Sequence, residues 1–415
     1  MKKLKRNFNN GNCQITEHSY EEASRMTRIT DVKTICLSRL HEIERQWTSS
    51  NFKTIKADCA IVLIETDSGL QGIGEACAYG EPKVIADWVG WYRRQLVGRR
   101  VDDFQSWPHT NDRNWGHDTA VAGIDCAVWD LRGKIENKRV SELISDSPDD
   151  RVRMYASGGV NYDWRHNPES LIEEVLGYQR DGFTASKVRI GTEWSWDGVT
   201  PDRFLGLMRD LRSAVGDEME LMVDGNQRLT VDEGLFIAHG LSDLNFTWFE
   251  EPIPQDDIDG YVKINGSVEI AITGGEQFAT LERFRPYIER RAYDIVQPDC
   301  GIAGLSESIK IAEYANDFGI DTCPHSWHNG LMAMAHAHFV AALPNPRVVE
   351  ICMPQGPLQS AIISGGLPIN DGSLQLPEQP GFGVEIPDNL EEEFPFIEGS
   401  YAIVMNRLPL FQSGR

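Results

Sequence analysis

Three carboxylic acids, Asp224, Glu250 and Glu276, recur at an almost constant interval, each at the end of a short apolar run. The interval fits one strand, one crossover helix and two loops, so we expect the acids at the ends of consecutive parallel strands. Carboxylates that converge in this way repel one another unless a cation lies between them. Oxygen ligands without Cys or His suit Mg²⁺. The pattern predicts a magnesium site made by these side chains; a salt-bridge network with nearby cations is the alternative.

Acid and base candidates occupy the neighbouring runs. Lys187 and Arg189 lie two residues apart in the run before the first acid, which points both cations to one face of a strand. Asp299 and His325 end the two runs that follow the last acid. An Asp one strand before a His can accept from the imidazole Nδ1–H, fix its tautomer and raise its basicity. We therefore predict that His325 is a general base and that Asp299 positions it.

Four further polar residues are candidates for the same site. His328 lies one loop turn after the predicted base and is the rival imidazole. Asn226 and Glu251 are near enough in sequence to orient the three acids without binding the metal themselves. Asn226 and His328 are also candidates for substrate contact. Glu350, from the eighth run, has two interpretations. It pairs with Lys187, or it is protonated and donates a hydrogen bond to a developing oxyanion.

The elements that must position these residues alternate between strand and helix. Eight strand-like runs between about 152 and 351 are enough to close a (β/α)₈ barrel with its chemistry on one face. The segments between them have helical patterns: Pro168–Arg180, Pro201–Val215, Val231–His239, Leu281–Arg290, Gly304–Phe318 and Leu331–Ala342. The alternative is an open doubly wound sheet, but no Gly-rich phosphate loop follows the first strand.

The chain before the barrel has the pattern of a mixed α+β domain. Cys59–Thr66 and Leu70–Ala78 flank a Gly-containing turn and predict a β-hairpin, and helices are expected at Pro82–Leu96 and Thr119–Glu136. The polar stretch Arg45–Asn51 is a candidate mobile loop. We predict an N-terminal arm at 1–28, an α+β domain at 29–150, a barrel domain at 151–380 and a segment at 381–415 that returns to the α+β domain.

Composition limits the class of protein. The chain has 415 residues, 41% of them apolar, which is enough for a large core. Its net charge of −23 argues against nucleic acid or an anionic membrane as a partner. The eight cysteines are scattered without a CxxC pair, as is typical of reduced thiols, and no apolar run is long enough to span a bilayer. These features predict a cytoplasmic protein.

The ordered motifs resemble those of the enolase superfamily, in its mandelate racemase and muconate lactonizing enzyme subgroup. They are Lys187-Val-Arg189, Asp224-Gly-Asn226, Trp-Phe-Glu250-Glu-Pro, Gly-Gly-Glu276, Gln-Pro-Asp299 and Pro-His325. The segments Ala122–Asp130 and Pro380–Glu385 are similar too, so the resemblance covers about residues 30 to 415. It implies homo-oligomers in which the α+β domain caps the barrel mouth and supplies substrate-selecting loops. Here the loop would be Arg45–Asn51, with Arg45 and Trp47 as candidates for substrate contact.

The resemblance also implies a chemistry. In that family Mg²⁺, held by the three strand-end acids, binds the substrate carboxylate and stabilises an enediolate that forms when the α-proton leaves. This chain departs from the usual Lys-x-Lys pair, because Arg189 replaces the second lysine. Arg is effectively always protonated and is a poor base. A racemase needs a base on each face of the substrate and is therefore disfavoured. His325 becomes the favoured base, and Lys187 is electrostatic support or an alternative base.

The leading hypothesis is dehydration of a sugar acid, an aldonate or aldarate, to a 2-keto-3-deoxy acid. A His that acts first as base and then as acid suits loss of water, and the Arg45–Asn51 stretch is polar. The alternatives are cycloisomerisation of a sugar lactone or anhydro-aldonate, which uses the same enediolate, and racemisation or epimerisation. A metal-binding barrel without turnover is the competing class.

Overall fold

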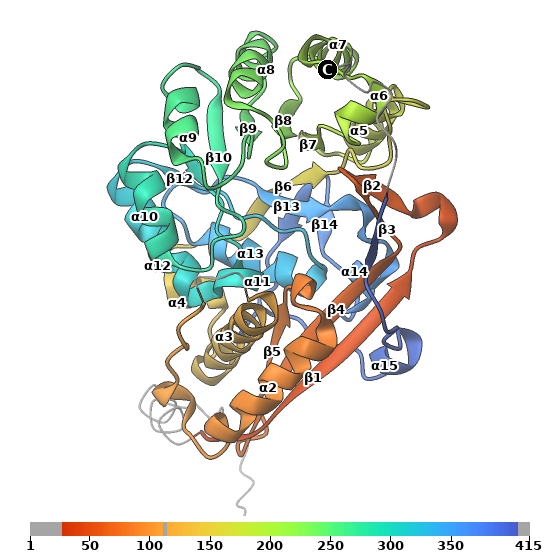
Figure 1. Cartoon of the computed structure of the whole chain (residues 1–415). Helices are drawn as coiled ribbons and strands as arrows, with labels where there is room; N and C mark the ends of the chain where they lie inside the picture. Colours follow the sequence, from red (N-terminus) through yellow and green to blue (C-terminus); the bar gives the residue numbers. More distant parts are fainter. Residues whose placement is uncertain (1–26, 111–113, 406–415) are drawn as a thin grey trace, which may run out of the picture.

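The computed structural model describes residues 27–110 and 114–405, and of the predicted arm only residues 27 and 28 fall within this range. Figure 1 shows a barrel of strands and helices with a smaller α+β domain packed against it. Seven cysteines lie in the described ranges, and all seven are buried free thiols. In these ranges, no helix is both long and apolar enough to cross a bilayer.

Parallel strands form the barrel. They are β6 (Arg151–Ser157), β7 (Ala185–Arg189), β8 (Glu220–Asp224), β9 (Trp248–Glu250), β10 (Ala271–Gly274), β11 (Ile295–Val296), β12 (Asp321–Thr322) and β13 (Val349–Cys352). Neighbours pair in chain order from β6 to β12, and β13 pairs in parallel with β6. Between β12 and β13, the Cys323 Sγ donates a hydrogen bond to the Val348 carbonyl oxygen at 3.1 Å. The barrel prediction is confirmed, and the open doubly wound sheet is excluded.

The barrel helices follow the predicted order. They are α5 (Ser170–Arg180), α7 (Pro201–Val215), α8 (Val231–Asp243), α9 (Ile258–Asn265), α10 (Leu281–Glu289), α12 (Leu305–Asp317) and α13 (Gly330–Ala341), with the short α6 (Trp194–Asp197), α11 (Cys300–Ala303) and α14 (Pro357–Ala361). A capping box of Thr230 and Glu233 begins α8, which runs four residues beyond its predicted end. The prediction missed α9. It also missed the hairpin of β14 (Ile369–Asn370) and β15 (Ser373–Gln375), which pairs antiparallel with β6.

The α+β domain, or cap, is built on an antiparallel sheet. Its strands are β1 (Ile29–Leu40), β4 (Lys56–Thr66) and β5 (Gln71–Ala76), and its helices are α2 (Pro82–Leu96), α3 (Trp115–Glu136) and α4 (Val140–Ile144). β4 and β5 form the predicted hairpin. Gly72 and Gly74 of β5 let α3 approach closely, since a Cβ on Gly74 would lie 2.4 Å from the Gly123 carbonyl oxygen. These glycines serve packing.

Helix α3 joins the cap to the barrel. The Asp125 carboxylate accepts hydrogen bonds from the Ser306 amide at 2.8 Å and from its hydroxyl at 2.7 Å, at the start of α12. Asp130 accepts from the Ile73 amide of the cap sheet and from the Phe382 amide at 2.7 Å, after the barrel. Both carboxylates are buried and paired, so the helix fixes the two domains against each other.

A second small sheet lies over the barrel mouth. It consists of β2 (Trp47–Ser49), β3 (Phe52–Thr54) and β16 (Ala402–Val404), all antiparallel. The expectation of a loop throughout Arg45–Asn51 is wrong at Trp47–Ser49, because β3 supplies the hydrogen-bond partners that make these three residues a strand. The last part of the chain that the structure describes lies against the cap through β16 and through α15 (Leu390–Glu393). The domain bounds and the homo-oligomeric state stay predictions.

Candidate active site

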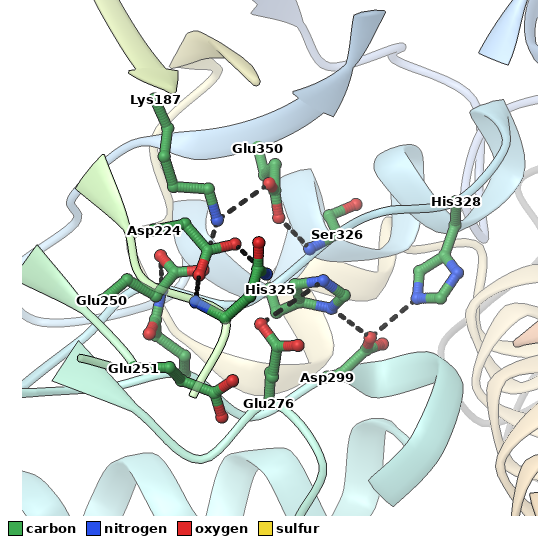
Figure 2. A network of polar contacts seen from close by, with 12 residues as sticks. Lys187, Asp224, Glu250, Glu251, Glu276, Asp299, His325, Ser326, His328 and Glu350 are labelled. Atoms are coloured by element: carbon green, nitrogen blue, oxygen red, sulfur yellow. Dashed lines mark hydrogen bonds and ion pairs between the residues drawn. The ribbon is translucent and has the colours of Figure 1, made fainter. Parts of the chain in front are cut away.

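The strand-end acids lie where the barrel register places them. Asp224 pairs with Arg189 on one side and Glu250 on the other, so three charged residues stand in a row across β7, β8 and β9. Glu276 follows β10 through a turn at Gly275, whose positive φ of 101° favours glycine. Figure 2 shows the carboxylates of Asp224, Glu250 and Glu276 gathered near Lys187 and His325. The structure brings together all three predicted metal ligands.

Lys187 lies between two carboxylates. Its Nζ forms ion pairs with Glu250 and, at 3.1 Å, with Glu350, and it lies 5.7 Å from the centre of the Tyr155 ring. Burial opposes the charged ammonium, but the two glutamates outweigh this effect and raise the pKa of Lys187 above its ordinary value. The lysine is therefore held protonated in this arrangement, which suits electrostatic support rather than a base.

Glu350 takes part in this ion pair. Its other oxygen accepts from the Ser326 amide at 2.6 Å. Burial favours the neutral acid, but Lys187 and His325 overcome it and lower the pKa of Glu350 to about 2. Of the two interpretations of Glu350, the geometry favours the ion pair over a protonated donor.

The donor set of the three acids fits Mg²⁺. Burial raises the pKa of Glu250 to about 7, even beside Lys187, because Asp224 and Glu276 add negative charge. A bound cation would relieve this excess. Asn226 donates to both oxygens of Asp224 at 2.7 Å, and its own buried Oδ1 has no hydrogen-bond partner among the described residues. Glu251 accepts from Gln227 at 2.8 Å with one oxygen and has a second, buried oxygen free of hydrogen bonds in that same part of the chain.

A second cluster has tighter spacing. Among the described residues, the one group of three side chains whose ligand atoms all lie within 4.8 Å is Asp299, His325 and His328. Both imidazoles lie 2.7 Å from the same Asp299 oxygen, at His325 Nδ1 and His328 Nε2, so hydrogen bonds explain the spacing. Asp224, Glu250 and Glu276 do not form such a group in this part of the chain, so their carboxylate oxygens stand further apart.

The Asp299 carboxylate orients the predicted base. A hydrogen bond to His325 Nδ1 leaves Nε2 on the side of the acids, 3.7 Å from Glu276 Oε2 (Figure 2). Burial favours neutral imidazole, but the neighbouring carboxylates of Glu276, Glu350 and Asp299 outweigh it and raise the pKa of His325 to about 9. The Gly301 amide donates to the other Asp299 oxygen at 2.7 Å and caps α11. The arrangement leaves the Nε2 atom of His325 facing the acids.

Arg189 lies at the boundary between the acids and the cap. Its guanidinium stacks on Trp327 at 4.0 Å, and its Nε is 3.7 Å from Asp224 Oδ2. Beyond it is a cavity of about 70 Å³ between the barrel mouth and the cap. Of the predicted residues, Trp47 and His328 line this cavity together with Arg189. Arg45 is exposed at the end of a 3₁₀ turn (η1, Ile43–Arg45) and does not line it.

The sequence analysis missed several residues of this cavity. Thr54 comes from β3, Tyr79 from a 3₁₀ turn (η2, Ala78–Gly80), Asn329 from the start of α13, and Tyr401 directly precedes β16. Tyr79 and Tyr401 stack with ring centres 6.2 Å apart. The one available signal was the strand-like stretch at 400–407, but pairing of that strand with β3 could not be derived from its own residues.

Comparisons with known proteins agree with this architecture. Residues 170–390 match the model of enolase C-terminal domain-like sequences, and residues 40–145 match the N-terminal domain of mandelate racemase and muconate lactonizing enzyme. D-galactarolactone cycloisomerase of Agrobacterium fabrum is 30% identical over 385 residues, which is 88% of this chain and 98% of that protein. Arabinonate dehydratase of Saccharolobus solfataricus is 29% identical over 340 residues, covering 80% of this chain and 89% of that protein.

Solved structures agree as well. The 3,6-anhydro-D-galactonate cycloisomerase of Zobellia galactanivorans superimposes with a TM-score of 0.74 at 27% identity, over 88% of this chain and 99% of that one. The matched family models span both the cap and the barrel that carries the three acids. Members of the enolase superfamily use Mg²⁺. The chain therefore belongs to this superfamily, in the mandelate racemase and muconate lactonizing enzyme group.

Proposed function

We propose that the protein is a Mg²⁺-dependent sugar acid dehydratase, which removes the α-proton of a hydroxylated carboxylate and releases water. The observation that carries the proposal is the placement of His325 Nε2, oriented by Asp299, on the side of the three acids. A base whose nitrogen faces a cation-binding carboxylate set is what proton abstraction next to a carboxylate requires.

The metal would be held by Asp224, Glu250 and Glu276. When bound, Mg²⁺ supplies positive charge that stabilises the negative charge developing on the carboxylate as the α-proton leaves. Lys187, fixed between Glu250 and Glu350, adds a second positive charge on the same side. Arg189 stacks on Trp327 and is suited to orient the substrate near the acids rather than to accept a proton.

His325 serves twice in the proposed reaction. Its Nε2 takes the C2 proton, and the electron pair of the C2–H bond moves toward the substrate carboxylate. The imidazolium then gives its proton to the C3 hydroxyl as the C3–O bond breaks, so that the electron pair forms the C2–C3 double bond and water leaves. The resulting enol becomes the 2-keto-3-deoxy acid. The Asp299 carboxylate stabilises the imidazolium between the two steps.

Cycloisomerisation of a sugar lactone is the second candidate. It is supported by the 30% identity to a D-galactarolactone cycloisomerase over nearly the whole of that protein. The same C2 proton would leave, but the ring C–O bond would break in place of a hydroxyl, so no water would be lost. A racemase has less support, because neither Lys187 in its two ion pairs nor Arg189 offers a second base.

The test is incubation of the purified chain with sugar acids and their lactones in D₂O with Mg²⁺, followed by NMR and mass spectrometry. A dehydratase gives a 2-keto acid that is lighter by one water, and a cycloisomerase gives a keto acid of unchanged composition apart from deuterium. His325→Asn should lower kcat by about 10²–10⁴-fold with the fold intact by circular dichroism. Full turnover by that variant would refute His325 as the base.

A further inference from the structure

Gln297 is a polar residue of the barrel interior that the proposed reaction does not use. It follows β11 directly and is fully buried. The next residue is Pro298, and a residue before proline is restricted to extended backbone, so Gln297 continues the line of the strand. Ile295, two residues earlier, belongs to an apolar cluster whose members come from successive barrel strands. Because side chains two residues apart on a strand share a face, Gln297 also points into the barrel.

The Gln297 amide reaches the carboxylate of Glu250. Its Nε2 donates to Glu250 Oε2 at 2.6 Å, and Trp248 Nε1 donates to the same oxygen at 3.2 Å. The other oxygen, Oε1, accepts from Lys187. An ionised carboxylate has about four lone-pair positions, so these three donors leave it about one. Glu250 is therefore held at both oxygens.

The orientation of the Gln297 amide follows from its partner. An indole N–H only donates, so Glu250 Oε2 accepts from Trp248, and it accepts from Gln297 in the same way. The Gln297 Oε1 atom is buried without a hydrogen-bond partner among the described residues. An unpaired buried oxygen is costly, and an apolar side chain of the same shape would avoid that cost. The hydrogen bond to Glu250 explains why a glutamine occupies this position.

A carboxylate fixed in this way distinguishes between two divalent cations. Mg²⁺ demands near-ideal octahedral geometry, whereas Ca²⁺ is larger, accepts more oxygens and can take both oxygens of one carboxylate. Gln297 and Trp248 occupy Oε2, so Glu250 offers a cation Oε1, the oxygen that also contacts Lys187. A ligand limited to one oxygen fits Mg²⁺ better than Ca²⁺.

We propose that Gln297 is a positioning residue that holds Glu250 as a single-oxygen ligand and thereby makes the site select Mg²⁺ over Ca²⁺. The inference rests on the proposed function, because it takes the three acids to hold the metal. It goes further by assigning ion selectivity to a residue outside those acids.

Gln297→Met tests the proposal, because methionine is unbranched, similar in size and unable to donate a hydrogen bond. Dissociation constants of Mg²⁺ and Ca²⁺ are measured by calorimetry without substrate, for this variant and for the unsubstituted protein. We expect the Mg²⁺ constant to rise about 10–100-fold. The Ca²⁺ constant should rise less, because Ca²⁺ can use both oxygens of the released carboxylate. An unchanged Mg²⁺ constant, or equal rises for the two ions, would overturn the proposal.

Gln227→Met is the matched control. Gln227 Nε2 donates to Glu251 Oε2 at 2.8 Å, so the same exchange removes the same kind of hydrogen bond from the neighbouring glutamate. The ratio of the two dissociation constants should stay unchanged in this variant. A change as large as that of Gln297→Met would show that the effect does not depend on Glu250, and would overturn the proposal.

Trp248→Phe is a second variant that keeps the test decisive if Gln297→Met does not fold. It removes the other donor to Glu250 Oε2 and keeps an aromatic ring in the barrel interior. Its preference for Mg²⁺ over Ca²⁺ should also fall. An unchanged or stronger preference for Mg²⁺ would contradict the single-oxygen role of Glu250.

The two proposals fail in different ways. If the unsubstituted protein binds no Mg²⁺, or if Glu250→Gln binds it equally well, the acids do not hold the ion and both proposals fail. If Mg²⁺ binds at the acids but no sugar acid exchanges its C2 proton, the proposed function fails and the ion selectivity stands. If sugar acids react and Gln297→Met keeps the ratio of the two constants, only the role of Gln297 is refuted.

Discussion

The two halves of the candidate site are assembled in different ways. In the barrel half, Arg189, Asp224 and Glu250 stand side by side because strand register puts them there. Their charges are buried and mostly paired. In the cap half, the lining comes from β2, β3, η2, the start of α13 and the residue before β16. Several of its polar atoms are buried without partners in the described residues.

The difference separates chemistry from selection. A barrel register tolerates little change, since a shift of one residue would turn each charged side chain to the opposite face. The cap half combines segments that can vary independently while the barrel stays intact. We infer that the barrel half fixes the reaction and the cap half fixes the substrate. The following predictions test this division, beginning with the largest effect.

Glu250→Gln should lower kcat/KM by about 10³-fold, because it removes a metal-binding charge and a partner of Lys187. Glu251→Gln is the matched control, because Glu251 is the next residue and is also buried, but it contacts Gln227 instead. Its loss should be about 10–100-fold. Kinetics at saturating Mg²⁺ and a Mg²⁺ titration measure both effects. Equal losses would remove the distinction between ligand and support.

Asp299→Asn should move the pH profile as well as lower the rate. Asp299 helps raise the pKa of His325 to about 9, so the base becomes free only as the pH rises toward that value. Without the carboxylate the pKa falls, and the rising limb of kcat/KM should shift to lower pH. The asparagine oxygen can still accept from the Gly301 amide and cap α11.

The pH profile of kcat/KM is recorded for the unsubstituted protein and for Asp299→Asn. It decides whether Asp299 positions His325 or has a purely structural role. A lower rate with an unmoved limb would show that Asp299 does not tune His325. Burial opposes ionisation of Asp299, but the two imidazoles outweigh it and hold its pKa well below the usual range. In the unsubstituted protein, the Asp299 carboxylate should therefore stay charged across the whole pH profile.

Gly74→Ala should destabilise the cap without changing the acids. Its Cβ would lie 2.4 Å from the Gly123 carbonyl oxygen and 2.6 Å from the Ala127 amide nitrogen of α3. Overpacking of this kind costs about 1–3 kcal/mol of unfolding free energy. Gly90→Ala, in the middle of α2 with open space around it, should stabilise by roughly 0.4–1 kcal/mol. Urea unfolding of the two variants measures both changes.

Tyr401→Phe should have the smallest effect. It removes one hydroxyl from the cap half and keeps the stacking on Tyr79. We expect aldonate kcat/KM to fall by about 2–10-fold and the pH profile to stay in place. A shifted pH profile would mean that the cap half contributes to proton transfer, against the division drawn above.

How much of the site could be predicted from the sequence differs between its barrel half and its cap half. The regular spacing of Asp224, Glu250 and Glu276 predicts barrel strands, and the register then follows from the fold. Asp299 and His325 could be placed in contact for the same reason. Trp47 was named as a candidate for substrate contact, but within an expected loop, and Tyr401 was not named. Their positions depend on pairing between β2, β3 and β16, which are distant in sequence, and no local pattern specifies such pairing.

The pairing of β16 with β3 has a consequence for biosynthesis. During translation the ribosome releases β2 and β3 first, then the whole barrel, and only afterwards the residues of β16. The acids, Lys187 and His325 can therefore be assembled while the wall that contains Tyr401 is still missing. Because such distant pairing forms slowly, we expect the nascent protein to acquire its reactive end before it acquires the ability to choose among substrates.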